Sequence, residues 1–290
     1  MADAANDKSV RFLYGTAAGR VILHLILALR VPRLLGAVLR SPLSRLYIPS
    51  FVRKNKIDMT DFEGVRFKSF NDFFTRKKEI TFDSDRAHLI SPADSLLSVF
   101  PITQDARFRI KGFDYTLGDF FDAERFGLSA EETCGPFIGG TCLVFRLCAT
   151  DYHRYCYVDS GSHCFGNLGG NHFIEGSLYS VQPLAAEKFR IYTKNRRSWT
   201  ILETENFGRI AQIEVGAFSV GGIQNHHGSA NGGSVSFRKG DEKGYFDLHG
   251  STIVLLVQKD RVRIRDEIKK ASDSGVEFRV RIGECVGVRS

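Results

Sequence analysis

Two patterns of apolar residues follow one another along the chain. In residues 8–56, apolar clusters alternate with single arginines, which is typical of short amphipathic helices. From residue 90 onward, short runs of β-type residues are separated by Gly, Asp and Asn. The pattern predicts an α+β fold, with a β-rich core and an N-terminal layer of short amphipathic helices, divided into residues 1–60 and 61–290.

The N-terminal segment is expected to lie on a surface and not to cross a membrane. Its most apolar run, residues 21–29, is nine residues long, whereas a spanning helix needs about 20. Pro32 and Pro42 should break the segment into short helices, of which residues 31–40 form the second. Apolar faces interleaved with arginine are typical of helices that lie in a membrane interface.

Charge strengthens this interpretation. Residues 1–56 carry ten Lys or Arg and two acidic residues, a net charge of +8, whereas residues 57–290 sum to −1. A basic segment favours an anionic partner, and we predict an anionic phospholipid membrane. The alternative is a helix that packs on the domain with its charges in water. No helix-turn-helix, RNA-recognition or zinc-finger pattern occurs, so nucleic acid is not an expected partner.

The core is predicted from the runs of β-type residues. Ser69 is a helix-start residue, and Phe70, Phe73 and Phe74 after it share a helical face. Long helices do not alternate with the strands, so a doubly wound parallel sheet is not expected. The predicted strands are residues 96–102, 137–148, 155–158, 178–181, 199–203, 211–215 and 252–257, with one helix at residues 117–122.

The six cysteines form no Cys-x-x-Cys pair, and the polar start of the chain has no secretory signal. We therefore expect reduced thiols in a cytoplasmic compartment. Cys156, His163, Cys164 and His172 match no standard zinc spacing, and we predict no metal site.

The stretch with the clearest chemistry is Gly250-Ser251-Thr252, which leads into an apolar strand. Gly250 permits a strained backbone, and the Ser251 hydroxyl lies beside the Gly250 carbonyl. With a base to take its proton, such a hydroxyl can attack the preceding peptide bond. Taken alone, the tripeptide is more typical of an ordinary turn between a loop and a strand.

Three other stretches are candidate site material. Asp94 ends a Ser-Pro-Ala-Asp turn, where it either stabilises its own turn or orients a base. His153 lies in a polar cluster, with Asp151 and Arg154, between two apolar runs. Small residues in the run 214–223 permit close approach of a ligand or of a neighbouring strand.

Taken together, these motifs resemble those of the phosphatidylserine decarboxylases, which carry a pyruvoyl group. Each motif is weak alone, but their common order along most of the chain is specific. They are FNDFFTR at 70–76, SPAD at 91–94, DYHR at 151–154, VGA at 215–217, VG at 220–221, KG at 239–240 and GST at 250–252.

The resemblance implies a proenzyme that cuts itself between Gly250 and Ser251. It would yield a beta chain, residues 1–250, and an alpha chain, residues 251–290, that begins with a pyruvoyl group made from Ser251. That group would form a Schiff base with phosphatidylserine, release carbon dioxide and leave phosphatidylethanolamine. Asp94 and His153 match family site positions. The resemblance also implies a peripheral protein on the cytoplasmic side of the cell membrane, with a homodimer as one option.

One departure leaves the cleavage base open. The family pattern has a second histidine three positions after the first, where this chain has Cys156. The candidates are His153, which lies in the matched motif, Cys156, whose unperturbed pKa of about 8.5 is high for a base, and His249. His249 is two positions before Ser251, so in an extended segment both side chains share a face.

Two other functions remain open from the sequence. One is a pyruvoyl decarboxylase of a soluble amino acid, and the other is an unprocessed lipid-binding relative. Phosphate-binding residues are indicated only by charge: Arg76, Arg154, Lys239 and Arg196.

Overall fold

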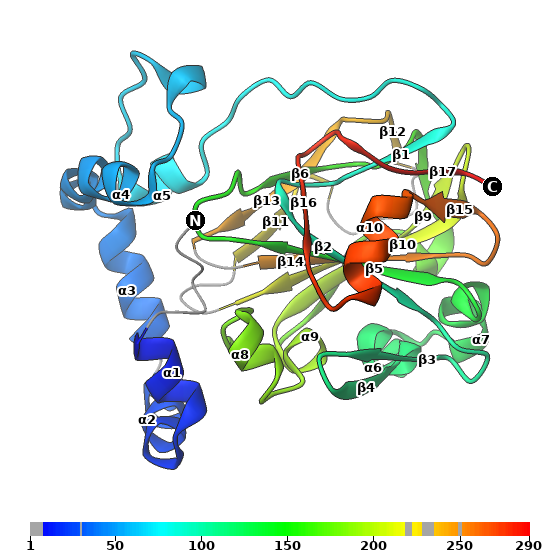
Figure 1. Ribbon diagram of the computed structural model, residues 1–290, viewed down its shortest axis with the longest axis horizontal. Coiled ribbons are helices and arrows are strands. Elements are labelled where there is room, and N and C mark those ends of the chain that lie inside the picture. The colour runs from blue at the N-terminus through cyan, green and yellow to red at the C-terminus, as the bar shows by residue number, and fades with distance from the viewer. Residues whose placement is uncertain (1–7, 30, 218–221, 228–234, 249–250) are drawn as a thin grey trace.

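The computed structural model describes residues 8–29, 31–217, 222–227, 235–248 and 251–290. A column of helices stands beside a core of β-sheets (Figure 1). The α+β prediction is confirmed, because the core is a large antiparallel sheet and the N-terminal layer is made of short helices.

The helical layer begins with two helices joined at a sharp bend. Thr16 caps the second of them by accepting a hydrogen bond from the Gly19 N–H. In the described part of the chain no single helix is long and apolar enough to cross a membrane; the first two pass that test only together, and they are bent by 96°. The helices of this layer are α1 (Lys8–Gly15), α2 (Ala17–Ala28), α3 (Val31–Arg40), α4 (Ile48–Asn55) and α5 (Phe70–Phe74), with a 3₁₀ turn η2 (Pro42–Tyr47).

The core is a nine-stranded antiparallel sheet in the order β12-β7-β9-β10-β14-β5-β2-β16, with β8 also paired to β9. Its strands are β2 (Ser95–Pro101), β5 (Thr141–Leu147), β7 (Gly161–His163), β8 (His172–Ile174), β9 (Arg197–Thr204), β10 (Gly208–Gly216), β12 (Ser236–Phe237), β14 (Ser251–Val257) and β16 (Phe278–Val280).

Both faces of this sheet are buried. All seven residues of β14 are buried, with Val254 and Leu256 in one apolar cluster and Ile253 and Leu255 in the other. A strand covered on both faces reads as a continuous apolar run, which is why the sequence predicted this strand clearly.

Smaller elements cover the two faces. Three-stranded sheets of order β1-β17-β15 and β11-β13-β6 form beside the large sheet, together with a β3–β4 hairpin. The strands are β1 (His88–Ile90), β3 (Arg107–Ile110), β4 (Phe113–Thr116), β6 (Arg154–Cys156), β11 (Gly222–Asn225), β13 (Glu242–Asp247), β15 (Val262–Ile264) and β17 (Cys285–Arg289). The helices are α6 (Leu117–Phe121), α7 (Ala130–Thr133), α8 (Pro183–Ala186), α9 (Ile191–Lys194) and α10 (Asp266–Asp273).

The helical layer is fixed to the core at two places. Near its start, the Tyr14 hydroxyl accepts a hydrogen bond of 2.8 Å from the Ser180 N–H. Near its end, Arg40 of α3 forms an ion pair of 2.7 Å with Asp247 of β13. An apolar cluster adds to the second contact and consists of the buried residues Ile48, Phe51, Phe70, Phe73, Phe74 and Leu248. We call this set the aromatic cluster.

Most predicted elements are confirmed, including the helix at residues 31–40 and the helix start at Ser69, whose hydroxyl accepts from the Asp72 N–H. The predicted strand at residues 178–181 is wrong. There the Asn195 side chain bonds both the N–H and the C=O of Tyr179, so these groups need no strand partner.

The last forty residues are threaded through several elements of the core. β14 lies between β10 and β5 in the large sheet, β16 pairs with β2, and β17 lies between β1 and β15. Backbone hydrogen bonds therefore tie residues 251–290 to the rest of the chain on both sides of β14 and on one side each of β16 and β17.

Candidate functional site

Ser251 opens β14 at the centre of the large sheet. It is fully buried, with Gly216 of β10 opposite it on one side and Leu147 of β5 on the other. Because side chains alternate along a strand, the Ser251 hydroxyl shares its face with Ile253 and Leu255. Those two side chains pack in the cluster that also contains residues of β6 and β13, so Ser251 faces the smaller sheet.

His153 immediately precedes β6 and meets Ser251 across the two sheets. Its Nδ1 atom is 3.1 Å from Ser251 Oγ, and its Nε2 atom is 3.0 Å from the Cys148 carbonyl oxygen. A carbonyl oxygen only accepts, so Nε2 must carry the proton. The lone pair of Nδ1 is then directed at the Ser251 hydroxyl, which is the arrangement of a base beside a nucleophile.

The imidazole ring is held by an aromatic neighbour. Phe74 of α5 stacks on His153 with ring centroids 4.0 Å apart and planes 28° from parallel. Both side chains are buried. Since Phe74 belongs to the aromatic cluster, the helical layer sets the position of the His153 ring.

The carbonyl that orients His153 is fixed by a second contact. Asp151 accepts a hydrogen bond of 2.7 Å from the Cys148 N–H, and its N–H donates to the Cys148 carbonyl. Arg279 of β16 bonds both oxygens of the Asp151 carboxylate. Burial raises the pKa of Asp151, while Arg279 acts in the opposite direction. The pair joins the loop beneath His153 to the last forty residues.

Asp94 has a different partner from the one expected. Its Oδ1 atom accepts a hydrogen bond of 2.8 Å from the Ile282 N–H, and among the described residues neither His153 nor Ser251 donates to it. Its charge contributes to raising the pKa of Asp151, so it lies near the site. The turn that it ends is tied to β6, because the Pro92 carbonyl accepts from the Cys156 N–H. A catalytic role for Asp94 stays a prediction.

The two other candidate bases are Cys156 and His249. Cys156 is fully buried, and its thiol donates to the Ser91 carbonyl at 3.8 Å. Burial raises the pKa of this thiol to about 12, so it is protonated at neutral pH and cannot take a proton from Ser251. His249 and Gly250 lie outside the described residues.

The backbone is strained just before these two residues. Leu248 has a φ of 37°, a left-handed conformation that costs a side-chain-bearing residue about 1–3 kcal/mol. Its side chain is buried in the aromatic cluster, and that packing holds the conformation.

A buried ion pair lies on the same face as Ser251. Glu214 is opposite Ile253 in the sheet, and its carboxylate is 2.7 Å from Lys243 Nζ of β13. Both side chains are at most 1% exposed. Asn225 completes the group, since its side chain accepts from Lys243 at 3.0 Å. Sequence analysis gave Glu214 no role, because its partner lies on another sheet.

The four phosphate candidates differ in their partners. Arg154 pairs with Glu242, Arg196 pairs with Glu175, and Lys239 Nζ donates to the carbonyls of residues 85 and 88. Arg76 has no carboxylate within ion-pair distance in the described part of the chain. Its guanidinium lies over the rings of Phe62 and Phe73, and its buried Nε has no hydrogen-bond partner among the described residues.

Comparison with known proteins identifies the family of the chain. Residues 70–288 match the family model described as phosphatidylserine decarboxylase. The chain belongs to the phosphatidylserine decarboxylase family. The family predicted from the sequence is therefore confirmed.

Full-length relatives agree with the family model. The chain is 39% identical over 283 residues to "Phosphatidylserine decarboxylase proenzyme 2" of Clostridium acetobutylicum, covering 96% of this chain and 91% of the relative. It is 36% identical to the phosphatidylserine decarboxylase proenzymes of Clostridium kluyveri, at 98% and 94% coverage, and of Desulfitobacterium hafniense, at 98% and 93%.

Sequence reasoning missed the groups that position His153 in this family member. Phe74 was recognised only as part of an apolar helix face, although it lies inside the FNDFFTR motif. The Cys148 carbonyl has no side-chain signature. Arg279 lies 128 positions from Asp151, so only the pairing of β16 with β2 brings them together.

Proposed function

We propose that this chain is a phosphatidylserine decarboxylase that cleaves itself between Gly250 and Ser251. The observation that carries the proposal is the distance of 3.1 Å between His153 Nδ1 and Ser251 Oγ in a fully buried site. Membership of the family supports the same conclusion.

In the cleavage step, His153 Nδ1 takes the hydroxyl proton while Ser251 Oγ bonds to the Gly250 carbonyl carbon. The peptide C–N bond then breaks, and an ester joins Gly250 to the serine oxygen. Loss of the Ser251 α-proton expels the Gly250 carboxylate from Cβ, and hydrolysis of the resulting enamine releases ammonia and leaves a pyruvoyl group. His153 is favoured as the base because its Nε2–H is held by the Cys148 carbonyl.

The pyruvoyl group fits this position, because Ser251 begins a strand whose neighbours exclude water on both sides. When present, it supplies a conjugated carbonyl that accepts the electrons left by departing carbon dioxide. His153 holds a proton beside that position, where the α-carbon of the product needs one. Phe74 keeps the imidazole from rotating away.

Arg76 is the residue we assign to the phosphate of the lipid head group. Its charge lacks a carboxylate partner among the described residues, and its Nε is buried without an acceptor. An unpaired buried donor is unfavourable unless a ligand accepts its hydrogen bond. Burial lowers the pKa of Arg76, and the charges of Tyr152, Asp94 and Asp151 oppose that shift, which supports a position close to the site.

The helical layer is assigned to the membrane surface. Of the 17 large apolar side chains that are exposed in the described part of the chain, twelve lie between Phe12 and Tyr47. They include Leu25, Leu34 and Val38, which are 56%, 66% and 61% exposed. Exposed apolar residues interleaved with basic ones suit an anionic bilayer, and the substrate is itself an anionic lipid. The protein is accordingly assigned to the cytoplasmic face as a peripheral protein.

The experiment that tests the function is intact mass spectrometry combined with a product assay. The expected result is two chains, of residues 1–250 and 251–290, with the second beginning with a carbonyl group that borohydride reduces. Vesicles containing phosphatidylserine should then yield phosphatidylethanolamine and carbon dioxide, whereas free amino acids should not react. A full-length chain without a reducible carbonyl would overturn the proposal, and Ser251→Ala supplies the uncut reference.

Membrane attachment needs a separate test. Deleting residues 1–56 would uncover the aromatic cluster, because Ile48 and Phe51 belong to it, so substitutions are preferable. Leu34→Glu with Val38→Glu should abolish co-sedimentation with anionic vesicles, whereas Val276→Glu, at an equally exposed site outside the helical layer, should not. Equal binding of the wild-type protein, the Leu34→Glu/Val38→Glu variant and the Val276→Glu variant would contradict the assignment.

A further inference from the structure

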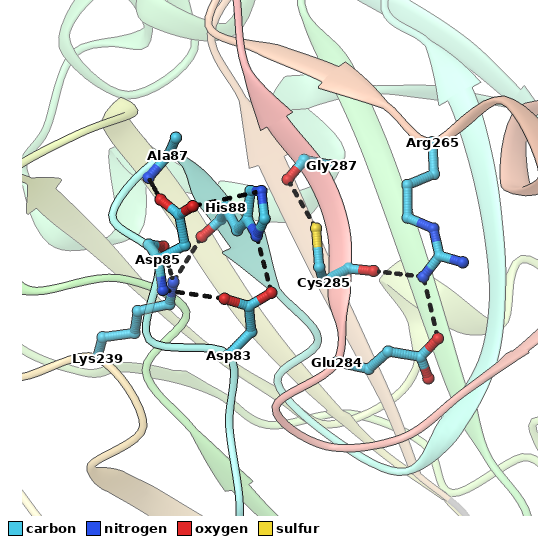
Figure 2. Close-up of polar contacts among 9 residues, drawn as sticks. All are labelled: Asp83, Asp85, Ala87, His88, Lys239, Arg265, Glu284, Cys285 and Gly287. Atoms are coloured by element: carbon cyan, nitrogen blue, oxygen red, sulfur yellow. Dashed lines mark hydrogen bonds and ion pairs between the residues drawn. The ribbon is translucent and has the colours of Figure 1, made fainter.

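Three potential metal ligands meet outside the site around Ser251. Asp83, His88 and Cys285 each offer one ligand atom, and these atoms all lie within 4.8 Å of one another. Figure 2 shows the three side chains gathered beside the start of β17. They supply one oxygen, one nitrogen and one sulfur, a donor set that suits a borderline-soft divalent cation such as Zn²⁺.

Two of the three ligands stand on paired strands. His88 is the first residue of β1 and Cys285 the first residue of β17. The register of the β1–β17 pair shifts between Leu89 and Ile90. The side chains of Leu89 and Ile90 are therefore both buried, while Cys285 remains partly exposed. A bulge of this kind re-aims a side chain, and it leaves the thiol of Cys285 beside His88.

The third ligand already contacts the second. Asp83 Oδ2 is 2.7 Å from His88 Nδ1, and Asp83 Oδ1 accepts from the Asp85 N–H at 2.9 Å. In a tetrahedral site with bonds of about 2.0–2.3 Å, ligand atoms are roughly 3.3–3.7 Å apart. The three donor atoms therefore reach that spacing by small rotations of the side chains. The Asp85 carboxylate is 3.8 Å from His88 Nε2, the ring nitrogen that points away from Asp83. It is therefore placed to orient the imidazole and not to bind the metal, and a water would fill the fourth position.

Charge at the cluster is compatible with a dication. The pKa of Asp83 is lowered, with burial opposing and the hydrogen bond from His88 favouring the carboxylate. Burial raises the pKa of the Cys285 thiol, so a metal must displace its proton. The thiol now donates to the Gly287 carbonyl at 3.4 Å. Bound Zn²⁺ would be neutralised by the carboxylate and the thiolate together.

The two nearby cations bond backbone carbonyls of the cluster and not its three donor atoms. Lys239 Nζ donates to the carbonyl oxygens of Asp85 and His88 at 2.6 and 2.7 Å. Arg265 pairs with Glu267 and Glu284. Neither side chain occupies the space among the three donors, as Figure 2 shows.

An entry path is present. A surface hollow of about 670 Å³ is lined by Asp83 and Cys285, together with Glu284 and Arg281. A metal can therefore reach the thiol and the carboxylate from solvent. Sequence spacing does not reveal the site, because its donors come from the beginning and the end of residues 61–290.

We propose that Asp83, His88 and Cys285 form a Zn²⁺ site. Asp83 and His88 precede the Gly250–Ser251 bond and Cys285 follows it, so the ion would also clamp the two chains together after cleavage. The clamping role rests on the proposed self-cleavage, whereas metal binding does not.

The test is zinc binding by the full-length protein after removal of metals with a chelator. Wild-type protein and the uncut Ser251→Ala protein should each bind one Zn²⁺ per chain, measured by atomic emission after gel filtration. Cys285→Ser and Asp83→Asn should each weaken binding at least about 100-fold. Cys164→Ser removes a buried thiol of the core and should leave binding unchanged. Circular dichroism confirms that each variant is folded.

Cobalt gives a second readout that reports the ligand directly. Co²⁺ added to the wild-type protein should produce a thiolate-to-cobalt charge-transfer band in the near ultraviolet, and Cys285→Ser should remove it. Absence of stoichiometric Zn²⁺ and of this band in both cut and uncut protein would overturn the site. If cut and uncut protein both bind Zn²⁺, but the cleaved chains separate in urea as fast with the ion as without it, the clamp alone would be overturned.

Discussion

The Nδ1 atom of His153 lies 3.1 Å from the Oγ atom of Ser251, although 98 positions separate the two residues in the sequence. The contact exists because β14 is central in the large sheet and the segment before β6 crosses over its buried face. The Cys148 carbonyl fixes the tautomer of His153 and Phe74 fixes the plane of its ring. The proposed nucleophile and the proposed base are therefore already aligned in the uncut chain.

Replacing His153 should slow self-cleavage strongly. We expect His153→Gln to slow the cut by about 10²–10⁴-fold, the range that a positioned base contributes. The measurement is the time course of the two chains on a denaturing gel after synthesis at neutral pH.

The matched control is the neighbouring thiol. Cys156→Ala should cleave at the wild-type rate, because a thiol with a pKa of about 12 holds its proton. Loss of cleavage in Cys156→Ala or in His249→Ala, with cleavage retained in His153→Gln, would show that the base is misassigned.

Phe74 should act as a positioning residue. Phe74→Leu removes the ring that stacks on His153 and allows the imidazole to turn, so cleavage should slow by about 10–100-fold. The lower rate should keep the wild-type dependence on pH, because the base itself is unchanged. Phe51→Leu is the control within the same aromatic cluster: it loses similar packing and makes no stack with His153. Equal slowing in both variants would reduce the role of Phe74 to stability.

Some of this arrangement could be read from the sequence and some could not. The apolar run of β14 and the helix start at Ser69 have local signatures, and both were predicted. The motif order indicated Ser251 and His153. No local pattern indicates that Asp94 bonds the Ile282 N–H, or that Glu214 and Lys243 are paired, because those partners meet only when separate strands associate. The strand predicted at residues 178–181 failed for the same reason, since the Asn195 side chain comes from a later turn.

Arg76 should be needed for substrate binding and not for self-cleavage. Arg76→Gln removes the guanidinium, and loss of a charge-assisted hydrogen bond of about 1.5–3 kcal/mol should raise KM for phosphatidylserine about 10–100-fold. The rate of self-cleavage should stay at the wild-type value. Arg196→Gln breaks a surface pair with Glu175 and should change neither quantity. An unchanged KM in Arg76→Gln would remove this residue from the phosphate site.

The ion pair between Glu214 and Lys243 should dominate local stability. Lys243→Met leaves a buried carboxylate without its cation, which should lower the free energy of unfolding by about 3–5 kcal/mol in urea denaturation. Adding Glu214→Gln to the same chain removes the uncompensated charge and should restore most of the loss. Two single losses that simply add in the double variant would show that the residues are not coupled.

His163 should make the fold less stable in acid. Burial lowers its pKa from 6.5 to about 4, with smaller contributions from Lys243 and His227. Its Nε2 lies 2.9 Å from the Tyr157 hydroxyl, and its buried Nδ1 has no hydrogen-bond partner in the part of the chain that the structure describes. Between pH 6.5 and pH 4 the unfolded chain therefore binds a proton that the folded chain does not. The stabilising contribution is complete above pH 6.5 and declines as the pH falls through this window. Urea unfolding at several pH values should show a shallower loss of stability for His163→Gln than for the wild-type protein, and parallel curves would contradict the assignment.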